Sequence, residues 1–93
     1  PAVLKLISLT CQGAQKYSRS VAVCGAMAGD LSAVPFLIGL GVSELAAGIK
    51  NIAQIKALIR RLNRQQCAQI AAQALELSSA QEVRALGRKH FAL

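Results

Sequence analysis

The sequence predicts an α/β fold in which two parallel strands are covered by helices and followed by a helical tail. Two short runs of small and β-branched apolar residues alternate with segments of helical periodicity, a pattern typical of parallel sheets with right-handed crossovers. Hydrophobic residues make up 54% of the chain but aromatic residues only 3%, so small aliphatic side chains supply most of the core. This composition suits helices and strands that are packed on both sides.

The predicted elements are too few to complete an α/β domain. A chain of 93 residues forms one domain at most, and two strands alone do not make a stable sheet. A (β/α) barrel needs eight strand–helix units and about 250 residues. We therefore expect a C-terminal fragment of a (β/α)8 TIM barrel, with its last two units at 20–62, a helix at 1–17 before them and tail helices at 63–93.

The first helix and the first strand follow from their residue patterns. A helix is predicted from Pro1 to Tyr17, because proline suits the first position and apolar residues recur at helical spacing. Cys11 falls on the apolar stripe and is predicted to be a core residue. A strand is predicted from Ser20 to Cys24, and its lack of polar alternation indicates burial on both faces. The loop that follows closes on Asp30, an acceptor able to cap the next helix.

The second strand–helix pair is shorter. A helix is predicted to begin near Ser32, so that Pro35 falls in its first turn, where a missing N–H is harmless. Gly39 and Gly41 offer a left-handed stop to this helix. Val42 to Ala46 is the second predicted strand.

Three pairs of residues at capping-box spacing predict the starts of the last three helices. These pairs are Asn51 with Gln54, Asn63 with Gln66, and Ser79 with Glu82. Apolar residues then recur at helical spacing on one face of each helix. The predicted faces are Ile52, Ile55, Ile59 and Leu62; Ile70, Ala71, Ala74 and Leu75; and Val83 and Leu86.

The net positive charge points toward three classes of anionic partner. Eleven Lys and Arg residues against four acids give a net charge of +7, which points toward nucleic acid, an anionic membrane surface or an anionic substrate. The basic residues are scattered and stacking aromatics are nearly missing, so we expect no nucleic acid. Arg60, Arg61 and Arg64 cluster in sequence. Such a cluster could steer an acidic partner, but a solvated helix face is the preferred prediction.

Membrane insertion, secretion and a metal centre are not expected. The longest apolar stretch, 31–40, contains Pro35 and is far shorter than the roughly 20 residues of a spanning helix. The opening residues lack the basic leader and cleavage site of a signal peptide. Three cysteines form neither a disulfide framework nor a CxxC metal pattern, so a reducing, cytoplasmic setting is expected. Cys67 is predicted to pack, and His90 to lie at a solvated helix end.

Several motifs resemble one protein family in the same order and spacing. Segments 23–25, 27–30, 33–35 and 39–42 read VCG, MAGD, AVP and GLGV. This series resembles the C-terminal region of enzyme I of the bacterial sugar phosphotransferase system and of its multiphosphoryl transfer relatives. The opening PAVLKLI and the later IKALIR at 55–60 also look like that family, so the resemblance covers nearly the whole chain.

The resemblance implies an activity and partners for a longer parent protein. Such a parent takes a phosphoryl group from phosphoenolpyruvate and passes it through its own histidine to the phosphocarrier HPr. Its phosphoenolpyruvate-binding domain is a (β/α)8 barrel that uses Mg²⁺ and forms a homo-oligomer, and the family's metal-binding acids and phosphate-gripping arginines precede Pro1.

The resemblance also places a catalytic residue in this chain. The cysteine of the matching motif protonates the enolpyruvate carbon as pyruvate forms, and this role falls on Cys24. Gly25 is assigned to substrate binding, because a residue without Cβ lets the backbone approach a ligand. A cysteine at the end of a barrel strand also lies where barrel enzymes bind substrate. By itself, a chain with one part of the site is expected to be inactive.

The chain departs from the family pattern at positions close to the expected site. Ala26 stands where glutamate is common, 46–48 reads AAG in place of Ser-Met-Ser, and Ala53 replaces a proline. These departures point to a divergent or weakened paralogue. The enzyme fragment is the first hypothesis, and the alternative is a non-catalytic self-association or regulatory module of such a paralogue, in which the exposed barrel seam and helices drive assembly. Nucleic-acid binding is a third, weaker hypothesis.

Overall fold

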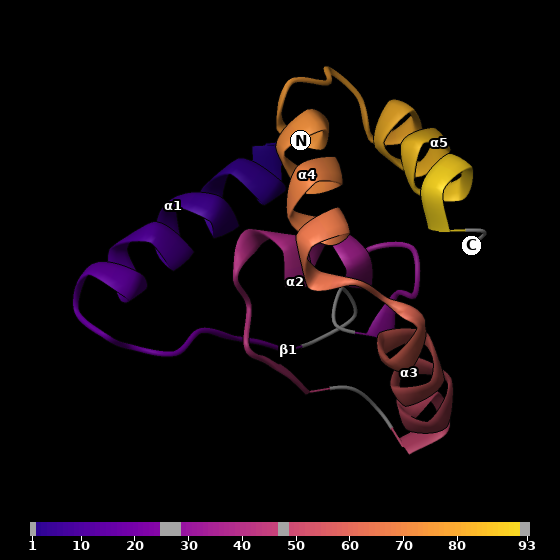
Figure 1. The fold of residues 1–93 in the computed structure, drawn as a ribbon, viewed down its shortest axis with the longest axis horizontal. Coiled ribbons are helices and arrows are strands. Elements are labelled where there is room, and N and C mark those ends of the chain that lie inside the picture. Colours follow the sequence, from indigo (N-terminus) through magenta and orange to yellow (C-terminus); the bar gives the residue numbers. More distant parts are fainter. Residues whose placement is uncertain (1, 25–28, 47–48, 92–93) are drawn as a thin grey trace.

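A computed structural model describes residues 2–24, 29–46 and 49–91. The order of helix, strand, short helix, strand and three helices agrees with the sequence prediction (Figure 1). The elements are α1 (Ala2–Lys16), β1 (Ala22–Cys24), α2 (Val34–Leu40), β2 (Glu44–Ala46), α3 (Ile49–Arg61), α4 (Arg64–Leu75) and α5 (Ala80–Phe91).

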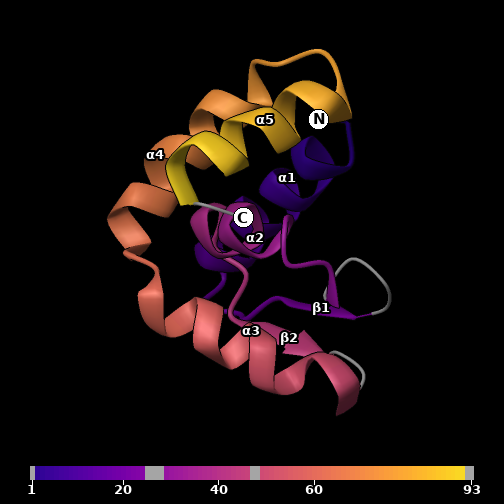
Figure 2. The same cartoon turned by 90° about the vertical axis from the view of Figure 1, so that its right-hand side faces the viewer.

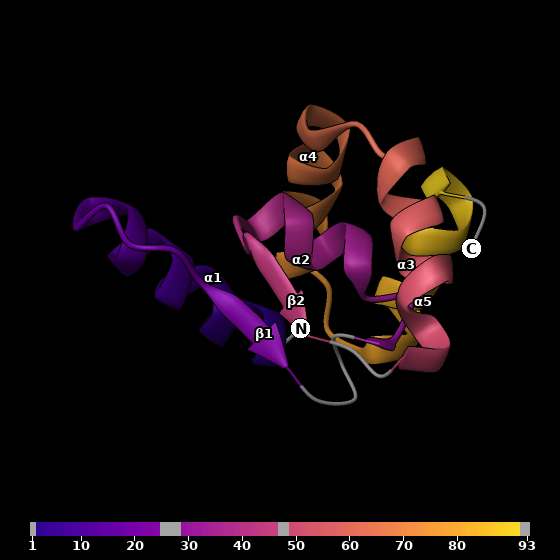
Figure 3. The ribbon, with the colours of Figure 1, turned by 90° about the horizontal axis from the view of Figure 1, so that it is seen from below.

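The two strands form a parallel pair, as predicted, and each is three residues long (Figure 3). Ala22 pairs with Glu44, Val23 with Leu45 and Cys24 with Ala46. The strand starts are joined at Val21, whose carbonyl oxygen accepts hydrogen bonds from the backbone N–H of Ser43 at 3.0 Å and of Glu44 at 3.2 Å.

One face of this sheet is open, so the prediction that the first strand is buried on both faces is wrong for this chain. Val23 and Leu45 are half-buried and pack against the core, whereas their neighbours along the strands are exposed. The physical reason is the two-residue period of a strand, which sends alternate side chains to opposite faces. The helical core lies against the Val23 and Leu45 face. The exposed face carries Ala22, Cys24, Glu44 and Ala46.

Helix α2 lies at the centre of the molecule, between α1, α3 and α4 (Figure 2). Its first four residues, from Val34 to Leu37, are all buried. Pro35 occupies the first turn, as predicted, where its missing N–H costs nothing. The ring of Phe36 meets that of Phe91 from α5 edge-on, with centroids 6.4 Å apart and an interplanar angle of 87°.

The turn after α2 directs the chain into β2. Gly41 has φ +107°, a left-handed conformation that glycine adopts without a Cβ penalty. The Gly41 N–H donates to the Ile38 carbonyl oxygen and the Val42 N–H to that of Leu37, both at 3.1 Å. This pair of bonds is a Schellman motif, and it confirms the predicted glycine stop.

Asp30 does not cap α2, contrary to the prediction. The residue before the helix is Ala33, which makes no side-chain cap. Asp30 Oδ1 instead accepts hydrogen bonds from the Ser32 backbone N–H at 3.0 Å and from the Ser32 hydroxyl at 2.6 Å. The aspartate therefore stabilises the turn that precedes the helix.

Two of the three predicted helix starts are confirmed. The Asn63 side chain accepts a hydrogen bond from the Gln66 N–H at 3.0 Å, and Ser79 Oγ accepts one from the Glu82 N–H at 3.2 Å. The start predicted at Asn51 is wrong, because α3 already begins at Ile49. A residue in the interior of the first turn cannot act as the N-cap.

The apolar stripe predicted for α3 is covered along only part of its length. Ile55 is buried and Leu62 half-buried, but Ile52 and Ile59 remain 39% and 41% exposed. Leu58, which was outside the predicted stripe, is 4% exposed. In α4 and α5 the predicted faces agree with the structure: Ile70, Ala71, Ala74 and Val83 are buried, and Leu75 and Leu86 are half-buried against them.

The main contact of the core is that of α4 with α2. Gly39 on α2 lies so close to α4 that a Cβ atom at this position would overlap the carbonyl oxygen of Cys67 and lie 2.9 Å from the Cβ of Ala71. Cys67 and Ala74 are fully buried at this contact. Small residues on both helices therefore allow the two backbones to approach one another.

Gly39→Ala is expected to lower the free energy of unfolding by about 1–3 kcal/mol or more, because the added methyl group meets backbone that cannot move aside. Gly13→Ala in α1 is the matched control, since a Cβ there meets nothing within 4 Å. The control should stabilise the chain by about 0.5–1 kcal/mol, the usual gain for alanine in a helix interior. Urea unfolding followed by circular dichroism measures both, and an equal effect of the two substitutions would contradict the close contact.

Ser79→Ala is expected to cost about 1 kcal/mol of stability, the usual value for an N-cap side chain. Ser78 and Ser79 both donate hydrogen bonds to Glu82 Oε1, at 2.8 and 3.1 Å, and these bonds lower the pKa of Glu82. A carboxyl group whose pKa is lowered on folding contributes stability above its unfolded pKa and loses it as the pH falls through the folded pKa. The difference between Ser79→Ala and the unmodified chain should therefore be smaller in acid than at neutral pH. Ser20→Ala, at an exposed position, serves as the control, and a difference that does not change with pH would refute the role of Glu82.

Candidate active site

Cys24 is the last residue of β1 and pairs with Ala46, the last residue of β2. It is exposed, and it shares the open face of the sheet with Ala22 and Glu44. The carboxyl ends of parallel strands meet at one edge of a sheet, which is where α/β proteins bind their ligands. The thiol predicted to be catalytic is therefore accessible at the sheet edge where such chemistry takes place.

The neighbourhood of Cys24 is partly outside the described residues. Gly25, the predicted substrate-binding residue, lies there, and so do Ala26, Ala47 and Gly48, which depart from the family pattern. Ala53, another departure, is exposed within α3.

The other two cysteines are core residues, as predicted. Cys11 is 2% and Cys67 0% exposed, and both pack in the hydrophobic core. Burial raises the pKa of both thiols, which keeps them protonated and unreactive. Cys24 differs from them because it is exposed.

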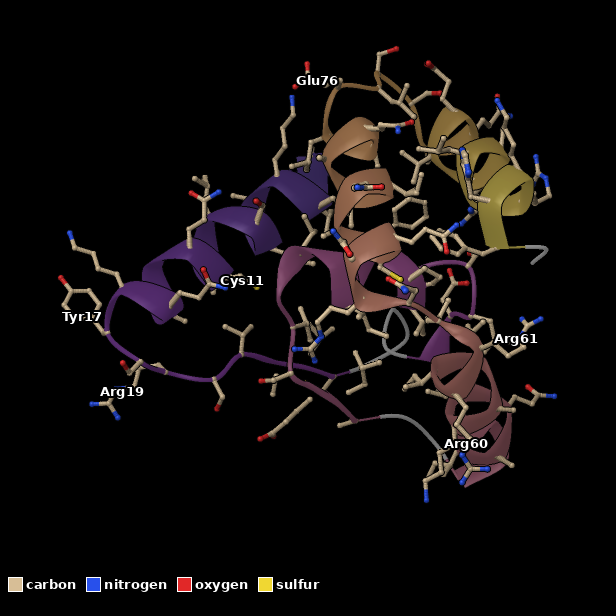
Figure 4. The ribbon with its side chains drawn as sticks, viewed as in Figure 1. Cys11, Tyr17, Arg19, Arg60, Arg61 and Glu76 are labelled. Carbon is tan, nitrogen blue, oxygen red and sulfur yellow. The ribbon has the colours of Figure 1, made fainter. Side chains whose placement is uncertain are left out.

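Two further sequence predictions concern polar side chains. Arg60, Arg61 and Arg64 are exposed, in agreement with a solvated face, and Figure 4 shows Arg61 directed away from the rest of the molecule. His90 lies half-buried in the last turn of α5, so it is less solvated than predicted.

The described part of the chain brings no cluster of metal-ligating side chains together. Within residues 2–24, 29–46 and 49–91, no three side chains of His, Cys, Asp or Glu lie close enough to hold one ion. Among the same residues, no helix combines the length and the apolar character that crossing a bilayer requires.

One feature of the structure was missed by sequence reasoning. A cavity of about 580 Å³ lies between α2, β2 and α3. Periodicity predicted an apolar stripe on α3, but it did not indicate that three isoleucines of this stripe would line an open groove. The lining residues are Ile38, Val42, Ser43, Leu45, Ala46, Ile52, Ile55, Lys56, Ile59, Leu62 and Arg64.

Comparison with known proteins places this sequence in a family. Residues 1–64 match the family described as "PEP-utilising enzyme, PEP-binding domain". The chain is 36% identical over 92 residues to the phosphoenolpyruvate-protein phosphotransferase of Listeria monocytogenes, covering 99% of this chain and 16% of the relative. It is 35% identical over 91 residues to the phosphotransferase of the same name from Bacillus subtilis, covering 98% and 16%.

A relative with a different name is also similar. The multiphosphoryl transfer protein of Xanthomonas campestris is 44% identical over 86 residues, which cover 92% of this chain and 10% of the relative. The chain therefore spans about one sixth or less of the length of these relatives. The family match covers more than half of the chain and includes both strands, Cys24 and α2. This chain belongs to the PEP-utilising enzyme family, within its PEP-binding domain.

Proposed function

We propose that this chain is part of a phosphoenolpyruvate-protein phosphotransferase. Such a parent protein moves a phosphoryl group from phosphoenolpyruvate to its own histidine and then to the phosphocarrier HPr for sugar uptake. The relatives from Listeria and Bacillus carry this enzyme name and match the chain over nearly its whole length. Their names favour an enzyme over the non-catalytic module considered as the alternative.

The open sheet supports completion of a (β/α)8 barrel by the rest of the parent. In a barrel, alternate side chains of each strand face the interior and the helical layer. Val23 and Leu45 pack toward the helices, so Ala22, Cys24, Glu44 and Ala46 would face the interior. Their exposure in this chain is what an incomplete barrel would leave.

The position of Cys24 is the observation that carries the proposal. Loss of the phosphoryl group leaves an enolate, with negative charge shared between the oxygen and the methylene carbon. The Cys24 S–H donates its proton to this carbon, the C=C bond gives way to the C=O bond of pyruvate, and the sulfur is left as a thiolate. A general acid must reach the atom that it protonates, and a thiol at the carboxyl end of a barrel strand is at the substrate face.

The remaining parts of the activity belong to residues outside this chain. Mg²⁺ prefers clustered oxygen ligands, and the described carboxylates form no such cluster, so no step through the metal is assigned to these residues. Formation of a homo-oligomer by the parent and its contact with HPr remain predictions from the resemblance, and its cytoplasmic location remains a prediction from the cysteine pattern.

Cys24→Ala in the full-length parent is expected to reduce transfer of phosphoryl groups from phosphoenolpyruvate to HPr by about 10²–10⁴-fold, the usual contribution of a general acid. Binding of phosphoenolpyruvate should change little, because the thiol acts on the enolate that forms later. Pyruvate release measures the first effect, and calorimetric titration measures the second. Cys67→Ala is the control, since that thiol is buried away from the sheet edge.

Two results would contradict this proposal in different ways. Full activity of Cys24→Ala would show that Cys24 is not the proton donor, but it would leave the proposed enzyme class unaffected. A parent that binds phosphoenolpyruvate and forms no pyruvate would favour the non-catalytic alternative.

The 93-residue chain alone, mixed with phosphoenolpyruvate and Mg²⁺, should form no pyruvate, because the rest of the site is proposed to lie elsewhere in the parent. Turnover by this chain would refute the idea that the site is completed elsewhere.

Thiol labelling of the 93-residue chain provides a further prediction. Cys24 is exposed while Cys11 and Cys67 are buried with raised pKa values. A disulfide reagent should therefore modify one thiol per native chain quickly and the other two only after denaturation. Cys24→Ala should abolish the fast phase, and a fast phase that survives this substitution would show that the core opens readily.

A further inference from the structure

Among the described residues of the open sheet face, Glu44 is the one charged side chain, and the activity proposed above gives it no part. Strand register pairs Ala22 with Glu44 and Cys24 with Ala46. These four side chains share the face that is exposed in this chain and that would line the interior of a completed barrel. Glu44 and Cys24 therefore lie diagonally across the strand pair, on the same side of it.

The diagonal between these two residues is short enough for a glutamate side chain to cross. Neighbouring strands lie about 4.8 Å apart and two residues along a strand span about 6.6 Å, which places the Cα atoms of Glu44 and Cys24 about 8 Å apart. Same-face diagonals of this size are within reach of long side chains. The other two corners, Ala22 and Ala46, carry only a methyl group, so neither fills the space between the carboxyl group and the thiol.

The other acids of the chain lie on other elements. Asp30 is hydrogen-bonded in the turn before α2, Glu82 in the first turn of α5, and Glu76 follows α4. Glu44 is thus the acid that shares a face with the Cys24 thiol. As the first residue of β2, it lies further than Cys24 from the carboxyl edge of the sheet, where substrate would bind.

The reaction proposed above leaves Cys24 as a thiolate, which must regain a proton before the next turnover. Pyruvate would lie on the substrate side of the sulfur, and a closed active site excludes water. A supply from the barrel interior avoids this block. A thiolate beside a carboxylate brings two negative charges together, which favours uptake of a proton by the pair. A carboxyl group within hydrogen-bond reach, or one water away, can pass that proton on.

We propose that Glu44 returns a proton to Cys24 after each turnover. The carboxyl O–H bond of Glu44 breaks, an S–H bond forms at Cys24, and the remaining carboxylate takes up a proton from water. No electrons are transferred, and the proton consumed in each cycle ends on the methyl group of pyruvate. Glu44 acts through Cys24 and does not touch the substrate. This role rests on the proposed function, because it requires a thiolate to restore.

Differential labelling of the 93-residue chain tests whether the two side chains are close. Cys24 is the exposed thiol, so fast labelling reports on it. A nearby carboxylate favours a positively charged methanethiosulfonate reagent over a negatively charged one, and Glu44→Gln should shift the ratio of the two rates by about twofold or more at low salt. Glu76→Gln, which removes the same charge at an exposed position after α4, should leave the ratio unchanged. Equal ratios in all three proteins would overturn the juxtaposition.

Comparison of the first turnover with later ones tests the relay in the full-length parent. Without HPr, each active site forms one pyruvate from a thiol that is already protonated; with HPr, the parent turns over repeatedly. Glu44→Gln should leave the first rate within about twofold of the unmodified parent and lower the repeated rate by about tenfold or more. Formate should raise the repeated rate of Glu44→Ala by entering the space left by the side chain, whereas chloride should not. Glu76→Gln is again the control and should match the unmodified parent in both phases.

The results that contradict the relay differ from those that contradict the phosphotransferase. An equal loss of rate in both phases would make Glu44 a structural part of the site, and weaker calorimetric binding of phosphoenolpyruvate would make it a substrate ligand; either would overturn the relay. Unchanged rates in both phases would refute the relay and keep the enzyme class. An unmodified parent that forms no pyruvate would refute the proposed function, and with it the need for a relay. Circular dichroism checks that each variant remains folded.

Discussion

The close contact between α2 and α4 is the constraint on which the rest of the structure depends. Gly39 and Cys67 bring the two backbones together, and this contact covers a helix whose first four residues are all buried. The other elements are attached to α2: α1 along its flank, Phe91 of α5 against Phe36, and β2 through the turn at Gly41. Because packed interiors tolerate little overlap, the absence of a single side chain at Gly39 sets how these parts meet.

The helical layer of the structure has a buried core, whereas one face of the sheet is not covered. The helical layer buries its apolar residues on α2 and α4, while the sheet presents Ala22, Cys24, Glu44 and Ala46 without a cover. This division explains why Cys24 is accessible and why the two remaining cysteines are not. It also agrees with the short share of the relatives that the chain spans. Chemistry proposed for Cys24 would thus take place on the side that other parts of the parent complete.

Local signals were the most predictable part of this sequence, and features that depend on distant partners were the least. Asn63 and Ser79 cap their helices through residues three positions away, so the sequence carries the whole interaction. Asn51 has the same spacing, but α3 begins earlier, at Ile49. Periodicity correctly identified an apolar stripe on α3, yet it could not reveal that Ile52 and Ile59 would lack a covering element. Cys24 is proposed as the proton donor on the strength of the family motif, since a thiol after an apolar run is not distinctive by itself.

The contact of Phe36 with Phe91 has a consequence for synthesis of the chain. Phe36 is 1% exposed, and the elements that cover α2 include α4 and α5, which are made after it. As the chain leaves the ribosome from its N-terminus, α2 is complete well before residues 64–91 can close over it. The four consecutive buried residues of α2 therefore remain only partly covered, by α1 alone, until those helices emerge. Exposed apolar surface of this kind promotes misassociation during folding, so the α2 segment is where a chaperone would be most useful to the nascent protein.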